Sequence, residues 1–222
     1  MKFPIMRLII ISPPESLRDE PMQVARMLED LPVIVHLRKP GQGTDRIAHY
    51  LDQIPAGLHP CIMVHSHSEL LTHFNLKGIH FTEKDRLGRL PHIRRLRQRR
   101  PDACLSSAFH RISDIPDGDS LFDYIFLSPI FDSISKTGYR AAFDHDGLKQ
   151  FLSQTDQSII ALGGVNEKRL PLAASMGFSG VAVLGAVWQA PDPVAAAGGL
   201  WDICRNIMPL PAKVISGGQR RL

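Results

Sequence analysis

Eight short runs of apolar, largely β-branched residues recur along the chain, separated by polar turns and by segments with helical periodicity. The runs cover residues 7–11, 33–37, 61–64, 78–81, 103–105, 124–127, 159–162 and 181–184. Most are apolar at nearly every position and do not alternate with polar residues, which is typical of parallel strands covered on both faces. The pattern therefore predicts an α/β protein with a parallel sheet beneath helices.

Helices are expected between these runs, over residues 22–28, 45–54, 93–100, 148–154 and 167–176. Pro21 precedes the first, and Thr44 and Asn166 are the expected N-caps of the second and the last. Eight strands in so short a chain favour a single (β/α)8 TIM barrel, because an open doubly wound sheet more often stops at about five or six strands. We expect the barrel to cover residues 1–208 and the aperiodic, basic segment 209–222 to be a mobile tail.

The amino-acid composition limits the classes of ligand that the chain is expected to bind. The chain has 26 basic and 22 acidic residues, a net charge of +4, which favours a small phosphate ester more than nucleic acid. The arginines of residues 92–100 would be spread around a helix as a solvated face. The first apolar run is too short to cross a membrane, and three widely spaced cysteines give no disulfide framework, so we expect a cytoplasmic protein.

Polar side chains follow the expected strands at the point where each strand ends. In a (β/α)8 barrel these ends share one face, and the loops after them gather around one cavity. The candidates after strands two to five are His36, Arg38, His65, Ser66, His67, His80, Glu83, Asp85, Ser107 and His110.

Three later loops look suited to an anion. Serine hydroxyls and backbone N–H groups donate to phosphate oxygens, and a lysine supplies a positive charge. Glycines allow the backbone to approach a phosphate closely, as in the recurrent phosphate site of this type of barrel. For the loop after strand six a polar surface loop remains the alternative. The candidate phosphate ligands are Ser133, Ser135, Lys136, Gly163, Gly164, Leu184 and Gly185.

Four segments in the order 36–41 (HLRKPG), 74–85 (FNLKGIHFTEKD), 122–136 (FDYIFLSPIFDSISK) and 161–187 resemble one protein family. They are similar to the thiamine phosphate synthases and their relatives, the TenI-like thiazole tautomerases. The resemblance covers most of the chain, and it implies the same single (β/α)8 barrel.

The resemblance also implies roles for particular residues. Arg38 matches the family's pyrophosphate-contacting arginine, and Asp85 matches one of two magnesium-binding aspartates of the synthases. The phosphate loop corresponds to Ser133, Ser135 and Lys136, and the thiazole phosphate cradle to Gly163, Gly164, Leu184 and Gly185.

Other positions depart from the family pattern. His36 stands in place of a glutamine, Pro40 in place of a lysine, and His65-Ser66 in place of an Asn-Asp pair whose aspartate is the second magnesium ligand. These changes fall on the pyrophosphate half of the site. We still expect His36 and His65 to contact the substrate.

Retention of the thiazole half alone resembles the tautomerases, which move a proton within a thiazole carboxylate phosphate and need no metal. Such a reaction needs a group that titrates near neutrality, and His110 occupies the position of the active-site histidine in TenI-like proteins. The sequence therefore favours a thiazole tautomerase with His110 as general acid and base.

Alternatives stay open. A divergent thiamine phosphate synthase would join the thiazole phosphate to a pyrimidine pyrophosphate with Mg2+ on Asp85. A non-catalytic binding relative and a barrel hydrolase with Zn2+ on His65, His67 and a carboxylate such as Asp85 are further candidates. Family resemblance is compatible with a homodimer.

Overall fold

The computed structural model describes residues 6–116, 121–131 and 143–207. The expected tail, 209–222, lies outside these ranges. So do three of the predicted phosphate ligands, Ser133, Ser135 and Lys136.

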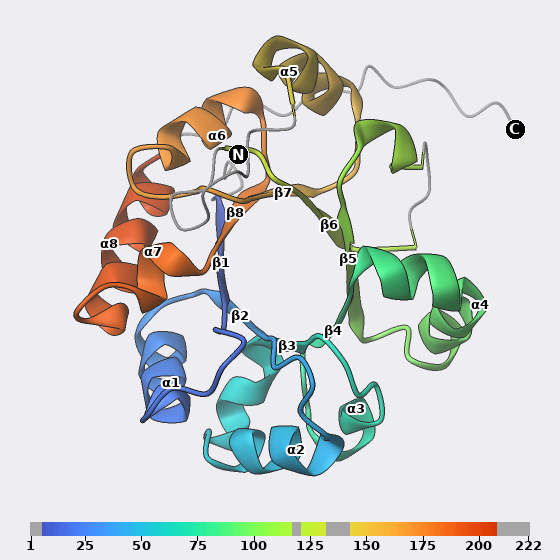
Figure 1. The fold of residues 1–222 in the computed structure, drawn as a ribbon, viewed down its shortest axis with the longest axis vertical. Coiled ribbons are helices and arrows are strands. Elements are labelled where there is room, and N and C mark those ends of the chain that lie inside the picture. Colours follow the sequence, from blue (N-terminus) through green and yellow to red (C-terminus); the bar gives the residue numbers. More distant parts are fainter. Residues whose placement is uncertain (1–5, 117–120, 132–142, 208–222) are drawn as a thin grey trace, which may run out of the picture.

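The described strands form one closed parallel barrel in chain order, with helices around its outside (Figure 1). β1 pairs with β2 on one side and with β8 on the other, so the sheet has no free edge. The strands are β1 (Arg7–Ile11), β2 (Ile34–Leu37), β3 (Ile62–Val64), β4 (Gly78–Phe81), β5 (Cys104–Phe109), β6 (Tyr124–Leu127), β7 (Ile159–Leu162) and β8 (Gly180–Val183). The predicted (β/α)8 barrel is confirmed.

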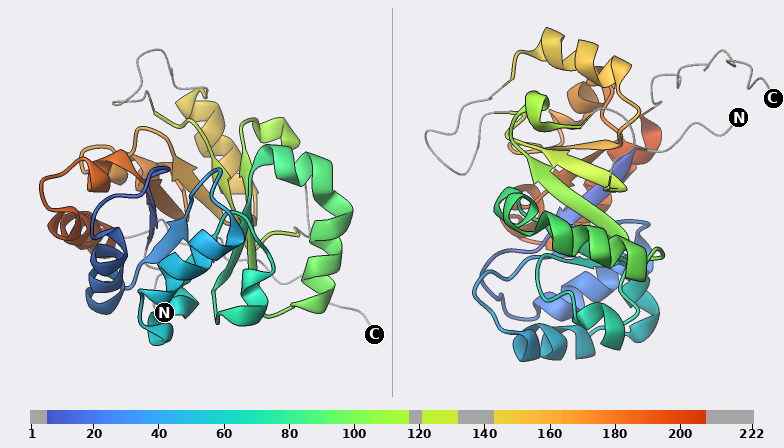
Figure 2. Two further views of the ribbon diagram at one scale, coloured as in Figure 1. Left: turned by 60° about the horizontal axis from the view of Figure 1, so that its bottom comes forward. Right: turned by 90° about the vertical axis from the view of Figure 1, so that its right-hand side faces the viewer.

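Helices follow the strands and cover the outer face of the sheet (Figure 2). They are α1 (Glu20–Asp30), α2 (Thr44–Asp52), α3 (Leu70–His73), α4 (Glu83–Arg99), α5 (His145–Gln154), α6 (Leu170–Met176), α7 (Gly185–Trp188) and α8 (Pro193–Asn206). The single-turn segments η1 (Ala56–Cys61) and η2 (Ile112–Asp114) precede β3 and follow β5. Among the described residues, no helix combines the length and apolar character that a membrane crossing requires.

Three helix predictions need correction. Asn166 is not the N-cap of the last predicted helix, because α6 begins at Leu170 with Arg169 as its N-cap, and the Asn166 side chain accepts from the Arg169 N–H in the turn before the helix. The helix expected at 93–100 begins ten residues earlier, at Glu83, and is kinked at Arg89 just before Pro91. Its N-cap is Thr82, whose hydroxyl accepts from the Asp85 N–H. Thr44 does not cap α2, because its hydroxyl instead bonds to side chains of the loop after β3.

The buried apolar residues of the strands form two separate clusters. The outward set packs beneath the helices, and the inward set fills the barrel with Ile9, Ile11, Met63, Tyr124, Phe126, Ile160 and Ala182. Both faces of every strand are therefore covered, which explains why the strand sequences lack polar alternation.

A buried ion pair joins the loops that follow β1 and β2. The side chains of Lys39 and Glu20 are fully buried, and Lys39 Nζ donates to a Glu20 carboxylate oxygen at 2.7 Å. Lys39 Nζ also donates to the carbonyls of Pro13 and Glu15, and the Tyr50 hydroxyl donates to the other Glu20 oxygen. Because every polar atom of the pair is used, these contacts hold Lys39, the residue that follows Arg38, in a fixed position.

Replacing one member of this pair leaves a buried charge without its counter-ion. We expect Glu20→Gln to lower the free energy of unfolding by about 3–5 kcal/mol. The matched control is Glu29→Gln on the exposed face of the same helix, with an expected change within about 0.5 kcal/mol. Urea unfolding of both variants tests this, and equal midpoints would show that the pair is dispensable.

Candidate functional site

Five consecutive strands, β2 to β6, each bring one polar side chain into the barrel. His36 lies on β2, His65 directly follows β3, His80 lies on β4, Ser106 on β5 and Tyr124 on β6. Each is an inward position, so the five side chains meet although 88 residues separate the first from the last.

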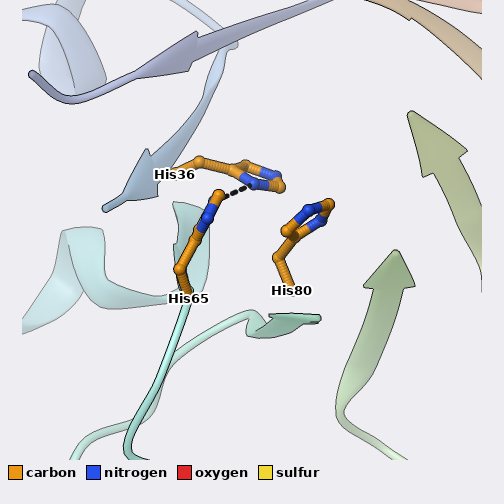
Figure 3. Close-up of side chains that lie close together, drawn as sticks. All are labelled: His36, His65 and His80. Carbon is orange, nitrogen blue, oxygen red and sulfur yellow. Dashed lines mark hydrogen bonds between the residues drawn. The ribbon is translucent and has the colours of Figure 1, made fainter. Parts of the chain in front are cut away.

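We call these five side chains the interior polar network. His36 Nδ1 lies 2.9 Å from His65 Nε2, and His36 Nε2 lies 2.6 Å from the Tyr124 hydroxyl. The Ser106 hydroxyl lies 2.9 Å from His80 Nδ1, and Ser106 is paired with Tyr124 in the register of β5 and β6. Figure 3 shows the three imidazoles pointing toward one another from their separate strands.

Burial keeps the three imidazoles neutral. His36 is fully buried and His80 is 3% exposed, while His65 at the mouth is half-buried. Burial lowers the pKa of His80 to about 3, helped by the positive charge of Arg38. Burial also lowers the pKa values of His36 and His65 well below the ordinary value, and neighbouring imidazoles add to the effect.

The aromatic ring of Phe126 packs against the imidazoles of the network. The Phe126 ring lies 4.9 Å from the His36 ring and 4.6 Å from the His80 ring, measured between centroids. His65 stacks over His80 at 4.4 Å. Packing therefore restricts ring rotation as well as the hydrogen bonds do.

Arg38 stands beside the network as a cation for a ligand. It follows β2, is half-buried, and lies close enough to His65 and His80 for its charge to lower both pKa values. Within residues 6–116, 121–131 and 143–207, no carboxylate forms an ion pair with its guanidinium. The neighbouring Lys39, by contrast, is paired with Glu20 in the fold. It therefore does not replace the lysine of the family pattern, whose position Pro40 occupies here.

His110 lies on a different part of the mouth, directly after β5. Its Nδ1 is 2.9 Å from the Ser128 carbonyl oxygen and 3.2 Å from the Ser128 hydroxyl. A carbonyl only accepts, so Nδ1 carries a proton and donates it to Ser128. The residue is exposed and is not part of the interior polar network.

The glycines after β7 adopt the backbone that only glycine takes up easily. Gly163 and Gly164 have φ values of 95° and 65°, and a Cβ on Gly163 would lie 2.9 Å from the Pro129 Cα. Leu184 caps the short helix α7, which begins at Gly185. Binding of phosphate by these four residues stays a prediction.

The zinc pair of the hydrolase alternative, His65 with His67, does not form. His65 points into the barrel, whereas His67 has a left-handed backbone with φ 60° and bonds to the Gln42 carbonyl, Thr44 and Glu69. The strand ends at Val64, so the two-residue spacing does not place both rings on one face. Asp85 sits in the first turn of α4 and accepts from the Thr82 hydroxyl, and Ser66 is exposed.

Sequence reasoning identified His36, His65 and His80 but missed Ser106 and Tyr124. Ser106 directly follows the predicted run 103–105, and Tyr124 begins the run 124–127, away from the strand ends where candidates are expected. Counting every second position along β5 and β6 would have shown that they face inward, since Ser106 and Tyr124 share a side of the sheet with Phe126.

Comparison with known proteins bears on this site. A family model described as "Thiamine monophosphate synthase" matches residues 8–187. The chain belongs to the thiamine monophosphate synthase family.

Relatives of known name agree with this family. The chain is 36% identical over 106 residues to the thiamine-phosphate synthase of Vibrio campbellii, covering 47% of this chain and 52% of the relative. It is 25% identical over 146 residues to that of Desulfitobacterium hafniense, covering 65% and 69%. The chain thus aligns with about half the length of the Vibrio relative. These names support the synthase alternative more than the tautomerase prediction.

Solved structures give the same picture. Thiamine phosphate pyrophosphorylase from Bacteroides thetaiotaomicron superposes with a TM-score of 0.67 at 25% identity, covering 89% of this chain and 95% of that one. The protein of the same name from Pyrococcus furiosus gives 0.70 at 19% identity, covering 90% and 95%, and supports the fold.

The buried imidazoles make stability depend on pH. They are neutral when folded and charged below about pH 6.5 when unfolded, so the unfolded state binds more protons and stability falls as pH falls. Each contributes a slope of up to about 1.4 kcal/mol per pH unit below that value.

We therefore expect the free energy of unfolding in urea to fall more between pH 7 and pH 5 for the wild type than for His36→Gln. His92→Gln, on an exposed position of α4, is the control and should keep the wild-type slope. Equal slopes for His36→Gln and the wild type would mean that His36 is protonated in the folded protein.

Proposed function

We propose that the chain is a divergent thiamine phosphate synthase that joins a thiazole phosphate to a pyrimidine pyrophosphate. The observation that carries this proposal is Arg38, which stands at the mouth with no carboxylate partner among the described residues. A tautomerase substrate carries one phosphate and one carboxylate, and no diphosphate. A synthase needs a cation for the diphosphate of its second substrate.

The proposed roles follow from position. Arg38 binds the diphosphate, and the backbone of Gly163 and Gly164 across the barrel receives the thiazole phosphate.

A magnesium ion fits this proposal with one protein carboxylate. Mg2+ is usually held by one or two carboxylates together with substrate phosphates and water. Asp85 is half-buried, and one of its two carboxylate oxygens bonds to Thr82. It would hold the ion together with the diphosphate, and the ion would neutralise charge on that leaving group.

Thiazole tautomerase is the second candidate, favoured by the geometry of His110. The bond from Nδ1 to the Ser128 carbonyl orients the exposed ring so that Nε2 is the nitrogen available for proton transfer. We place the tautomerase second because the relatives with known names are thiamine-phosphate synthases.

A paired assay separates the two candidates. One reaction holds thiazole phosphate, pyrimidine pyrophosphate and Mg2+, and the other holds the non-aromatic thiazole carboxylate phosphate alone. We expect thiamine phosphate in the first. Isomerisation in the second without product in the first would overturn the synthase proposal.

Two variants assign the residues. Arg38→Ala should lower kcat/KM for the pyrimidine pyrophosphate by about 10- to 100-fold, the effect of one charge-assisted hydrogen bond, while Arg46→Ala on the exposed face of α2 should not. His110→Asn should leave synthesis nearly unchanged and would abolish isomerisation if that reaction occurs.

A further inference from the structure

One group of metal-ligating side chains stands out in the described part of the chain. One nitrogen from each of His36, His65 and His80 lies within 4.8 Å of the other two. The three residues come from three adjacent strands, and Figure 3 shows their rings converging on one point.

The hydrogen bonds behind two of the rings determine which nitrogens converge. Tyr124 holds His36 Nε2, which turns His36 Nδ1 toward His65 Nε2, and Ser106 holds His80 Nδ1, which leaves His80 Nε2 free. Metal-binding histidines almost always have such a partner on the other ring nitrogen, because it fixes the tautomer and the orientation of the ring.

The protonation state also suits a metal. A metal binds the lone pair of a neutral imidazole, and all three rings are neutral because burial lowers their pKa values. The proton now shared between His36 Nδ1 and His65 Nε2 would move to the outer nitrogen of its own ring. No proton has to leave a charged group.

We infer that His36, His65 and His80 form a binding site for a divalent first-row transition ion such as Zn2+. Imidazole nitrogens suit Zn2+, Cu2+, Fe2+ and Ni2+, whereas Mg2+ prefers oxygen. The site lies beyond the proposed synthase activity and does not depend on it.

Small ring movements bring the nitrogens to coordination distance. Zn–N bonds of about 2.0–2.1 Å in tetrahedral array place the nitrogens about 3.4 Å apart. His36 Nδ1 and His65 Nε2 are 2.9 Å apart, and all three nitrogens lie within 4.8 Å of one another. Three histidine ligands leave a fourth position for water or an anionic oxygen.

The test measures binding directly. Tag-free protein is stripped with a chelator and titrated with Zn2+ by calorimetry, and with Co2+ by visible absorption. We expect one ion per chain and the intense visible bands of low-coordinate Co2+. Mg2+ should not compete with either ion.

Two variants restore the residues that the family resemblance places at these positions, His36→Gln and His65→Asn, so both are expected to fold. Each should weaken Zn2+ binding by more than about 100-fold, and Tyr124→Phe, which removes the partner of His36, by about 10- to 100-fold. His67→Asn and His92→Asn are the controls and should bind as the wild type does.

Circular dichroism confirms that each variant is folded. Absence of stoichiometric Zn2+ uptake by the wild type, or uptake unchanged in both His36→Gln and His65→Asn, would overturn the inference. This experiment measures metal binding and not turnover. A failure to bind Zn2+ therefore leaves the synthase proposal standing, and a failure of the synthase assay leaves the metal site standing.

Discussion

Closure of the sheet is the constraint on which the rest of this structure depends. Pairing of β1 with β8 leaves an interior that water scarcely reaches, so a polar side chain on an inward position must find its partner on another strand. His36 is fully buried, and both of its ring nitrogens are bonded, one to His65 and one to Tyr124. The polar network follows from the closed barrel.

The barrel could be predicted from the sequence because burial on both faces leaves a local signature, a short run without polar alternation. The start of α4 could not, since the periodicity before Pro91 is poor and Thr82 caps the helix well upstream. The interior polar network could not be predicted from the sequence either. Tyr124 begins β6 and His36 lies near the end of β2, and their contact depends on the stagger between strands that only the closed sheet defines.

The two neighbouring cations Arg38 and Lys39 show a second limit of prediction from sequence. Arg38 and Lys39 are neighbours in one basic segment and look equivalent. The structure separates them, because Lys39 turns outward into a pocket with Glu20 and Tyr50 while Arg38 turns toward the imidazoles. One cation maintains the fold and the other remains for a ligand. No pattern in HLRKPG distinguishes the two.

The hydrogen bonds from His65 through His36 to Tyr124 give this part of the barrel interior a direction. The neutral ring of His36 has one donor and one acceptor nitrogen, so His36 donates to one of its two neighbours and accepts from the other. A reversed His65 would set two hydrogens or two lone pairs face to face, at a cost of about 1–3 kcal/mol. The three side chains therefore change their proton positions together, and a change of tautomer at His65 is transmitted to the hydroxyl of Tyr124 on β6.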